Sequence, residues 1–371
     1  MKSPLVSVFL PYYNDADFLK TAIEAVLNQD FVDFELILLN HASTDDSRKI
    51  AHSYDDKRIV HIDVDKNLGA GSGYNMKLAL KQMHGKYVRL LCADDVMHSN
   101  CLSKLVDFME KNSDCDCVCS DLNFIDKLGN PVINKDFDFI RYSDFSRKSL
   151  LKSLLDGKNI ICYTTVMMKK EVLCNLNIDN TFIMHFDGML WADLLIKGYS
   201  ICKIDDKLID YRIHMNQTSR VFGSGLILEN IAFTNTFNNI KDIDLVKYLC
   251  SDVSYVENLS EGDEKYIPFI LAIHNLKSKN LSFVVSGYLY LYNAMNNNDF
   301  CDDVYKHFGF SIADFRGLYM DSCYLNKFLD VEYKKISIFK LLKLMFRRIF
   351  RVLTPKFYRN LFLNIKLKTK G

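Results

Sequence analysis

The chain has 371 residues, 49% of them hydrophobic and 25% charged, which is typical of a globular protein with a sizeable core. No apolar run reaches the about 18 residues of a membrane-spanning helix, and the first residues lack a signal-peptide pattern. The 11 cysteines form no Cys-x-x-Cys motif, so they favour a reducing cytoplasm over a disulfide framework.

Charge is unevenly distributed along the chain. Twelve Lys or Arg residues and no Asp or Glu lie between Lys334 and Gly371. Because the net charge is only +1, the other 333 residues together carry −11. An acidic body is therefore expected to end in a strongly basic tail.

Strands and helices are predicted to alternate in the first hundred residues. Apolar runs indicate strands, and apolar positions at helical spacing indicate the helices between them. The expected strands are Leu5–Leu10, Phe34–Leu39, Arg58–Val64 and Tyr87–Leu91, and the expected helices are Asp17–Leu27, a segment opened by Ser43–Ser47, and Gly73–Met83. This alternation predicts an α/β domain with a mostly parallel sheet.

Two adjacent carboxylates, Asp94 and Asp95, directly follow the strand Tyr87–Leu91. Ligands of open α/β sheets bind at the carboxyl ends of the strands, and carboxylate oxygens suit a hard divalent cation. An alternative is that the pair opens a loop and caps the next helix.

Four segments at the ends of predicted strands resemble the successive blocks of family 2 glycosyltransferases, which have the GT-A fold. They are Val6–Asn14, Phe34–Asp45, Asn67–Asn75 and Cys92–Asp95. The similarity extends to about Ser219 through Thr164–Met168, His185–Lys197 and Tyr211–Ser219. The resemblance implies a GT-A domain over residues 1–220, with a nucleotide-binding half at 1–97 and an acceptor half at 98–220. We expect helix Asn100–Lys111, strand Cys115–Ser120 and a polar loop through Asp136 in the second half, then a helical region at 221–333 and the tail at 334–371.

The resemblance also implies a nucleotide site. Its expected residues are Pro11, Tyr13, Asn14, Asn40, His41, Ser43, Asn67, Gly69, Asn75 and Asp94. Asn40 and His41 stand where the family usually has two acids, which puts the usual uridine preference in question. Tyr13 is expected against the nucleobase, or alternatively as an aromatic lid on the core. The glycines from Gly69 to Gly73 also allow a dinucleotide cradle of an oxidoreductase, although they follow the third strand and not the first.

A divalent metal, Mn²⁺ or Mg²⁺, is expected on Asp94, Asp95 and His214. Cys92 replaces the family's first acid, and a thiol is a poor ligand for these ions. His214 belongs to a segment resembling the family's Tyr-Arg-x-His, and its alternative is a structural histidine.

Asp187 is the candidate catalytic base. It follows the apolar Phe186, which should raise the proton affinity of the carboxylate. Asp187 would alternatively cap the helix that carries Trp191, and these two roles are compatible. Trp191 is expected to pack in the core and Asp193 to lie on the helix surface.

The basic tail is predicted to form an amphipathic helix. Basic residues recur at helical spacing on one face and apolar residues on the other, namely Lys340, Lys343, Arg347 and Arg351 against Ile338, Leu342, Met345, Ile349 and Leu353. Such a helix is typical of a segment on an anionic membrane surface, whereas a nucleic-acid arm needs no continuous apolar face. We expect peripheral attachment to the inner face of the cell membrane and no nucleic-acid partner.

These features together predict a metal-dependent, inverting glycosyltransferase. It would move a sugar from a nucleotide diphosphate sugar, with a UDP-sugar favoured, to a hydroxyl of a growing surface glycan or a lipid-linked acceptor. The alternatives are a non-catalytic sugar-nucleotide-binding relative and a dinucleotide-dependent oxidoreductase.

Overall fold

The structure is a computed structural model that describes residues 3–67, 72–133, 144–178, 182, 185–217 and 226–320. Chain contacts define a first compact unit, Met1–Phe300, and a second unit that begins at Cys301. The basic tail expected at 334–371 and the loop residue Gly69 lie outside the described residues. The domain boundaries expected at residues 97, 220 and 333 stay predictions.

An eight-stranded sheet forms the centre of the first unit, with strand order β3-β2-β1-β4-β7-β6-β8-β5. Its strands are β1 (Val6–Tyr12), β2 (Phe34–Asn40), β3 (Ile59–Asp63), β4 (Tyr87–Leu90), β5 (Val96–Met97), β6 (Cys117–Ile125), β7 (Val166–Lys169) and β8 (Ile201–Arg212). The pairs β3–β2, β2–β1, β1–β4 and β6–β8 are parallel, and β7 and β5 pair in the antiparallel direction. The expected mostly parallel sheet is confirmed, and every residue of β2 and β4 is buried.

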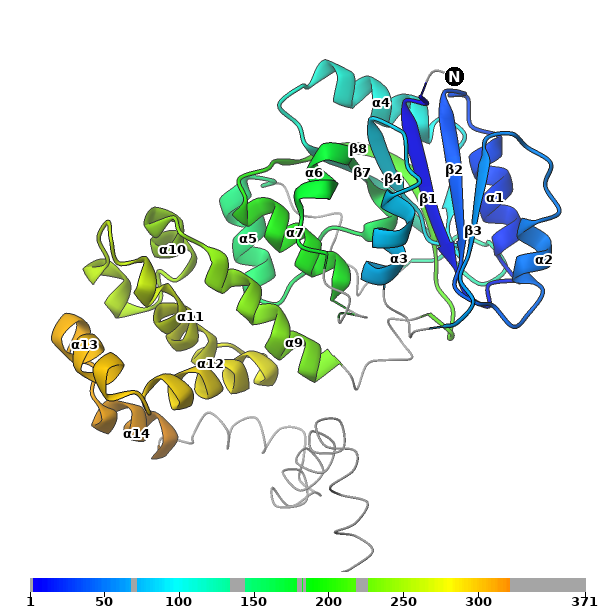
Figure 1. Cartoon of the computed structure of the whole chain (residues 1–371). Coiled ribbons are helices and arrows are strands. Elements are labelled where there is room, and N and C mark those ends of the chain that lie inside the picture. The colour runs from blue at the N-terminus through cyan, green and yellow to red at the C-terminus, as the bar shows by residue number, and fades with distance from the viewer. Residues whose placement is uncertain are drawn as a thin grey trace, which may run out of the picture. The chain divides into compact units, whose positions relative to one another are not determined.

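Helices alternate with the strands from β1 to β4 as expected, whereas β5 follows β4 directly (Figure 1). They are α1 (Leu19–Leu27), α2 (Ser47–Ala51), α3 (Ser72–Leu80), α4 (Cys101–Lys111), α5 (Arg147–Leu155), α6 (Lys170–Asn175) and α7 (Phe186–Ile196). Leu19, Ile23 and Val26 of α1 and Leu105 of α4 join one face of the sheet in a single core cluster. The apolar spacing read from the sequence therefore identifies the core-facing side of α1.

Strand β6 is longer than the sequence indicated. Its final residues, Asp121 to Ile125, were expected in a polar loop, but they pair with β8 as far as Arg212. The register between the strands shifts on either side of Asp121, as in a bulge. The middle of β8 is polar and exposed, so it lacks the apolar alternation by which a strand is recognised.

A helical region follows the sheet domain. In the first unit it contains α9 (Leu226–Thr234), α10 (Ile243–Leu249), α11 (Ile267–Leu276) and α12 (Leu281–Ala294). Helices α11 and α12 agree with the helical region expected after the sheet domain, and they approach closely at Gly287, where an added Cβ would lie 2.4 Å from the Ala272 carbonyl oxygen. Helices α13 (Asn298–Phe308) and α14 (Ile312–Met320) follow. Among the described helices, none has the length and hydropathy needed to cross a membrane.

Candidate active site

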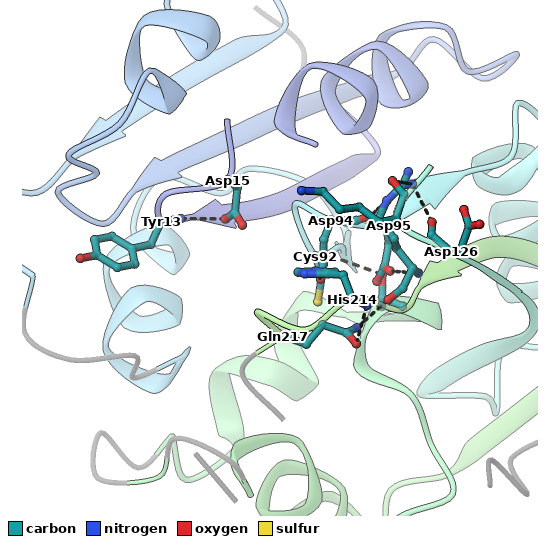
Figure 2. A network of polar contacts seen from close by, with 11 residues as sticks. Tyr13, Asp15, Cys92, Asp94, Asp95, Asp126, His214 and Gln217 are labelled. Atoms are coloured by element: carbon teal, nitrogen blue, oxygen red, sulfur yellow. Dashed lines mark hydrogen bonds and ion pairs between the residues drawn. The ribbon is translucent and has the colours of Figure 1, made fainter. Parts of the chain in front are cut away.

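The candidate site lies where β1, β2 and β4 end and where the last residues of β8 meet them (Figure 2). Parallel strands bring their carboxyl ends to one sheet edge. Tyr13 follows β1, Asn40 ends β2, Asp94 and Asp95 follow β4, and His214 follows β8. The sheet thus gathers residues that are up to about 200 positions apart in the chain.

Asp95 is held by the end of β8. It is 1% exposed, and its Oδ1 accepts a hydrogen bond from the Arg212 backbone N–H at 2.9 Å. Its Oδ2 is buried and has no hydrogen-bond partner in the part of the chain that the structure describes. Burial raises the pKa of Asp95, and the neighbouring charge of Asp94 raises it further. A cation at Oδ2 would relieve both effects.

Asp94 is more accessible, with 21% of its side chain exposed. Its Oδ2 lies 3.0 Å from His214 Nε2, and its backbone carbonyl accepts a hydrogen bond from Arg212 Nε at 2.8 Å. The same guanidinium donates to the carbonyls of Asp126 and Lys127. Arg212 therefore ties the Asp94–Asp95 turn to the loop after β6.

The donor set here fits a divalent cation. One carboxylate oxygen each from Asp94 and Asp95 and the Cys92 sulfur all lie within 4.8 Å of one another. Burial raises the pKa of the Cys92 thiol, so the thiol stays protonated and is a poor ligand for a hard ion. Asp94 and Asp95 are the residues that would hold the ion. His214 lies beside them as the hydrogen-bond partner of Asp94, and its role as a ligand stays a prediction.

Asp187 lies in the first turn of α7. Its Oδ2 accepts a hydrogen bond from Asn159 Nδ2 at 2.8 Å, and its Oδ1 accepts one from the Gly188 N–H at 2.7 Å. Burial raises its pKa to about 6, in the direction expected from the apolar surroundings. The N-cap position belongs to His185, so the alternative of Asp187 as the cap residue is wrong.

Of the two remaining expectations for α7, one is confirmed and one is wrong. Trp191 is fully buried and donates from Nε1 to the Ile161 carbonyl at 3.2 Å, so the expected packing role is confirmed. Asp193 was expected on the helix surface, which is wrong because it is 2% exposed. Its carboxylate accepts hydrogen bonds from the Asn177 N–H at 2.7 Å and from Lys197 Nζ at 2.8 Å. Helix α7 is buried on nearly all sides, and these partners make a buried carboxylate tolerable.

Aromatic rings gather beside the ends of β1 and β2. Tyr13 is 44% exposed, whereas His41 is 2% exposed. The His41 ring lies 6.4 Å from the Tyr13 ring and 6.5 Å from the Tyr74 ring, measured between centroids. Burial lowers the pKa of His41, so the imidazole is neutral at neutral pH. Tyr13 is thus an accessible ring beside a buried imidazole, and its contact with a nucleobase stays a prediction.

Asn14, Asn40 and Ser43 hold one another in place. Ser43 Oγ accepts from the Asn14 N–H at 3.1 Å, and Asn40 Oδ1 accepts from the Ser43 N–H at 2.9 Å. Asn40 Nδ2 donates to Asp63 Oδ1 at 2.8 Å, so both ends of this amide are used within the protein. Asn14 has a φ of 55°, a conformation that asparagine tolerates well. These residues fix the loop, and their contact with a nucleotide stays a prediction.

Other expected nucleotide residues are placed less completely. Pro11 lies in β1 opposite Leu39 of β2. Asn67 is the last described residue before the loop that contains Gly69. Asn75 is buried in α3, and its Oδ1 has no hydrogen-bond partner in the described part of the chain.

The structure also adds residues that sequence reasoning missed. Asp15 accepts a hydrogen bond from the Tyr13 N–H at 2.9 Å (Figure 2), and burial raises its pKa to about 6, with a further contribution from Asp94. Asn159 binds Asp187, and Asp63 binds Asn40. Arg212 was noted only within a motif. No local sequence signal marks Asn159 or Asp63, because their roles arise from contacts distant in the chain.

The fold is the GT-A fold. The structure of S. aureus TarS in complex with UDP-GlcNAc is similar, with a TM-score of 0.55 and 15% identity, covering 87% of this chain and 92% of that chain. The family model described as glycosyl transferase family 2 matches residues 7–176.

Curated relatives identify the family. An uncharacterized glycosyltransferase of Methanocaldococcus jannaschii is 32% identical over 217 residues, covering 57% of this chain and 72% of that protein. A glycosyltransferase named for teichuronic acid biosynthesis in Bacillus subtilis is 30% identical over 218 residues, covering 58% of this chain and 82% of that protein. The chain belongs to glycosyl transferase family 2 and is a glycosyltransferase.

Proposed function

We propose that the protein is a metal-dependent, inverting glycosyltransferase that uses a nucleotide diphosphate sugar. The observation that carries this proposal is the buried Oδ2 of Asp95, which has no hydrogen-bond partner among the described residues and belongs to a carboxylate pair with Asp94 that fits a divalent cation. Asp187 supports it as a further buried carboxylate, whose raised pKa suits a general base. The proposal requires the cation and the base to lie close together, because one acts on the donor and the other on the acceptor.

In the proposed reaction, Asp187 takes the proton from an acceptor hydroxyl. With a pKa of about 6, the carboxylate is ionised at neutral pH and is still basic enough to accept that proton. The acceptor oxygen then attacks the anomeric carbon, and the bond from that carbon to the nucleotide diphosphate breaks with its electrons on the leaving phosphate oxygen. Attack opposite to the leaving group inverts the anomeric configuration. A divalent ion on Asp94 and Asp95 would stabilise the charge on the leaving diphosphate.

Asn159 Nδ2 and the Gly188 N–H each donate a hydrogen bond to one oxygen of Asp187. These two hydrogen bonds hold the proposed base in position. Arg212 keeps Asp94 and Asp95 in register with β8 through the Asp95 carboxylate and the Asp94 carbonyl. His214 holds Asp94 Oδ2. The carboxylates of Asp94, Asp95 and Asp187 are therefore each oriented by a hydrogen bond from a neighbouring residue.

The proposed donor is a UDP-sugar and the proposed acceptor is lipid-linked. An Escherichia coli relative named UDP-Glc:alpha-D-GlcNAc-diphosphoundecaprenol beta-1,3-glucosyltransferase supports both, at 29% identity over 217 residues, with 58% of this chain and 80% of that protein covered. We further propose that the basic tail attaches the enzyme to the inner face of the cell membrane, where a lipid-linked acceptor would be available.

A thermal-shift screen tests the donor. UDP-glucose, UDP-GlcNAc, GDP-mannose and CMP-sialic acid are each added with and without Mn²⁺, and a rise in melting temperature that needs both UDP-sugar and Mn²⁺ is expected. The donor that binds is then incubated with GlcNAc-diphosphoundecaprenol, and the anomeric configuration of the product is read by NMR. A stabilising nucleotide sugar that needs no metal would contradict the metal dependence, and a product with retained configuration would contradict the inversion.

A further inference from the structure

The hydroxyl of Tyr163 is buried without a partner. Its Oη has no hydrogen-bond partner in the part of the chain that the structure describes, although it is shielded from solvent. A buried hydroxyl that makes no hydrogen bond costs free energy, so native proteins rarely keep one without a use for it. This hydroxyl is therefore a candidate for a contact that a ligand completes.

The turn that carries Tyr163 is held firmly. Tyr163–Thr165 form a short 3-10 helix between Cys162 and β7. The buried Arg89 of β4 donates from its guanidinium to the carbonyls of Thr164 and Val166, at 2.6 and 3.0 Å. The Cys92 N–H donates to Thr164 Oγ1 at 3.4 Å. The turn is thus fixed to the end of β4.

Tyr163 lies beside both parts of the proposed reaction site. The residue after it, Thr164, accepts the Cys92 N–H through Oγ1, and Cys92 stands two residues before Asp94. Burial raises the pKa of the Tyr163 phenol well above its ordinary value. Its ring centroid lies 6.5 Å from that of Phe186, the residue before Asp187. The Asp187 oxygens accept from Asn159 and from the Gly188 N–H, and among the described residues neither oxygen accepts from the phenol.

We propose that Tyr163 is a binding residue for the transferred sugar, whose hydroxyl or ring oxygen accepts a hydrogen bond from Oη. In the proposed function the diphosphate of the donor binds at the Asp94–Asp95 turn, and the acceptor is activated at Asp187. The sugar of the donor must then lie between these two places. The phenol stays neutral and keeps its proton, so it can act as a donor at any working pH. This inference rests on the proposed function.

Tyr163→Phe tests the inference because it removes only the hydroxyl. Isothermal titration in Mn²⁺ with UDP alone should give the same affinity for the variant and the wild type. Titration with UDP-glucose and UDP-GlcNAc should give binding weaker by about threefold to tenfold for the sugar that the wild type binds best, the usual effect of one lost hydrogen bond. Equal weakening for UDP alone, or no weakening for any UDP-sugar, would overturn the inference.

Melting temperatures without ligand give an independent test. Tyr163→Phe should leave the melting temperature unchanged or higher, because no internal hydrogen bond is lost. The matched control is Tyr199→Phe, which removes a hydroxyl that accepts from Asn175 Nδ2 at 3.2 Å outside the site and should not alter UDP-sugar binding. A lower melting temperature for Tyr163→Phe would show that the hydroxyl is structural and would refute the assignment. Failure of the wild type to bind any nucleotide sugar would instead refute the proposed function.

Discussion

Replacing Asp187 by Asn should remove catalysis while making the folded protein slightly more stable at neutral pH. The amide keeps the shape of the side chain but cannot take a proton. Turnover should fall by roughly 10²–10⁴, the usual contribution of a positioned general base, while donor binding stays close to that of the wild type. In the wild type, kcat/KM should fall about tenfold per pH unit below pH 6, because burial raises the pKa of Asp187 to about 6.

The stability change follows from the same pKa. Its rise from 3.8 to about 6 means that the ionised carboxylate is disfavoured by up to about 3 kcal/mol in the folded protein. This cost is absent below about pH 4, appears as pH rises toward 6, and is complete above pH 6. The amide carries no charge, but it has one acceptor oxygen where the carboxylate has two, for Asn159 and Gly188, so about 1 kcal/mol is lost. Partial exposure of the side chain reduces the gain, so we expect a net increase of about 1–2 kcal/mol at pH 7.5.

Urea denaturation of both proteins at pH 7.5 and pH 4, together with a pH–rate profile, measures these effects. The free energy of unfolding of Asp187→Asn should exceed that of the wild type at pH 7.5 and should not exceed it at pH 4. Asp193→Asn provides the matched control on the same helix, because its carboxylate binds Asn177 and Lys197 and its loss should destabilise the protein at pH 7.5. A variant of Asp187 that turns over at nearly the wild-type rate would show that another group is the base.

Three further outcomes are expected. Asp94→Asn or Asp95→Asn should abolish Mn²⁺-dependent binding of UDP with little change in fold, because the charge of a metal ligand is lost at nearly constant side-chain volume. Calorimetric titration measures this binding, and unchanged affinity in Mn²⁺ for both variants would show that the two acids are only structural. Gly85→Ala should lower the free energy of unfolding, measured in urea, by at least about 1–3 kcal/mol, because the new Cβ would lie 2.4 Å from the Ser7 nitrogen. Gly317→Ala is the control and should leave this free energy unchanged, because its new Cβ would have no atom within 4 Å. Deleting residues 334–371 should release the protein from anionic vesicles in a co-sedimentation assay and leave UDP binding unchanged. The deletion removes the attraction between the basic residues and the vesicle surface, to which each residue contributes about 1 kcal/mol at most. Equal sedimentation of the full-length and truncated proteins would exclude the tail as the anchor.

The local hydrophobic pattern of the sequence determined the order of strands and helices in the first hundred residues. Apolar runs and helical spacing predicted the alternating strands and helices of the first hundred residues, and each is present in the structure. The pair Asp94–Asp95 could be placed at a sheet edge because a carboxylate after a buried strand has no other position in a parallel sheet. The rise in the pKa of Asp187 could also be anticipated, because the apolar Phe186 precedes it in the chain.

Tertiary structure decided the features that depend on distant contacts. The polar middle of β8 gives no strand pattern, and only its pairing with β6 makes it a strand that ends at Arg212. Asp193 was predicted from its own helix to be a surface residue, yet it is buried because α7 is covered on nearly all sides, and Asn177 and Lys197 compensate its charge. The unpartnered Tyr163 hydroxyl is equally invisible in the sequence, because a sequence records which groups can form hydrogen bonds and only the fold decides which of them find a partner.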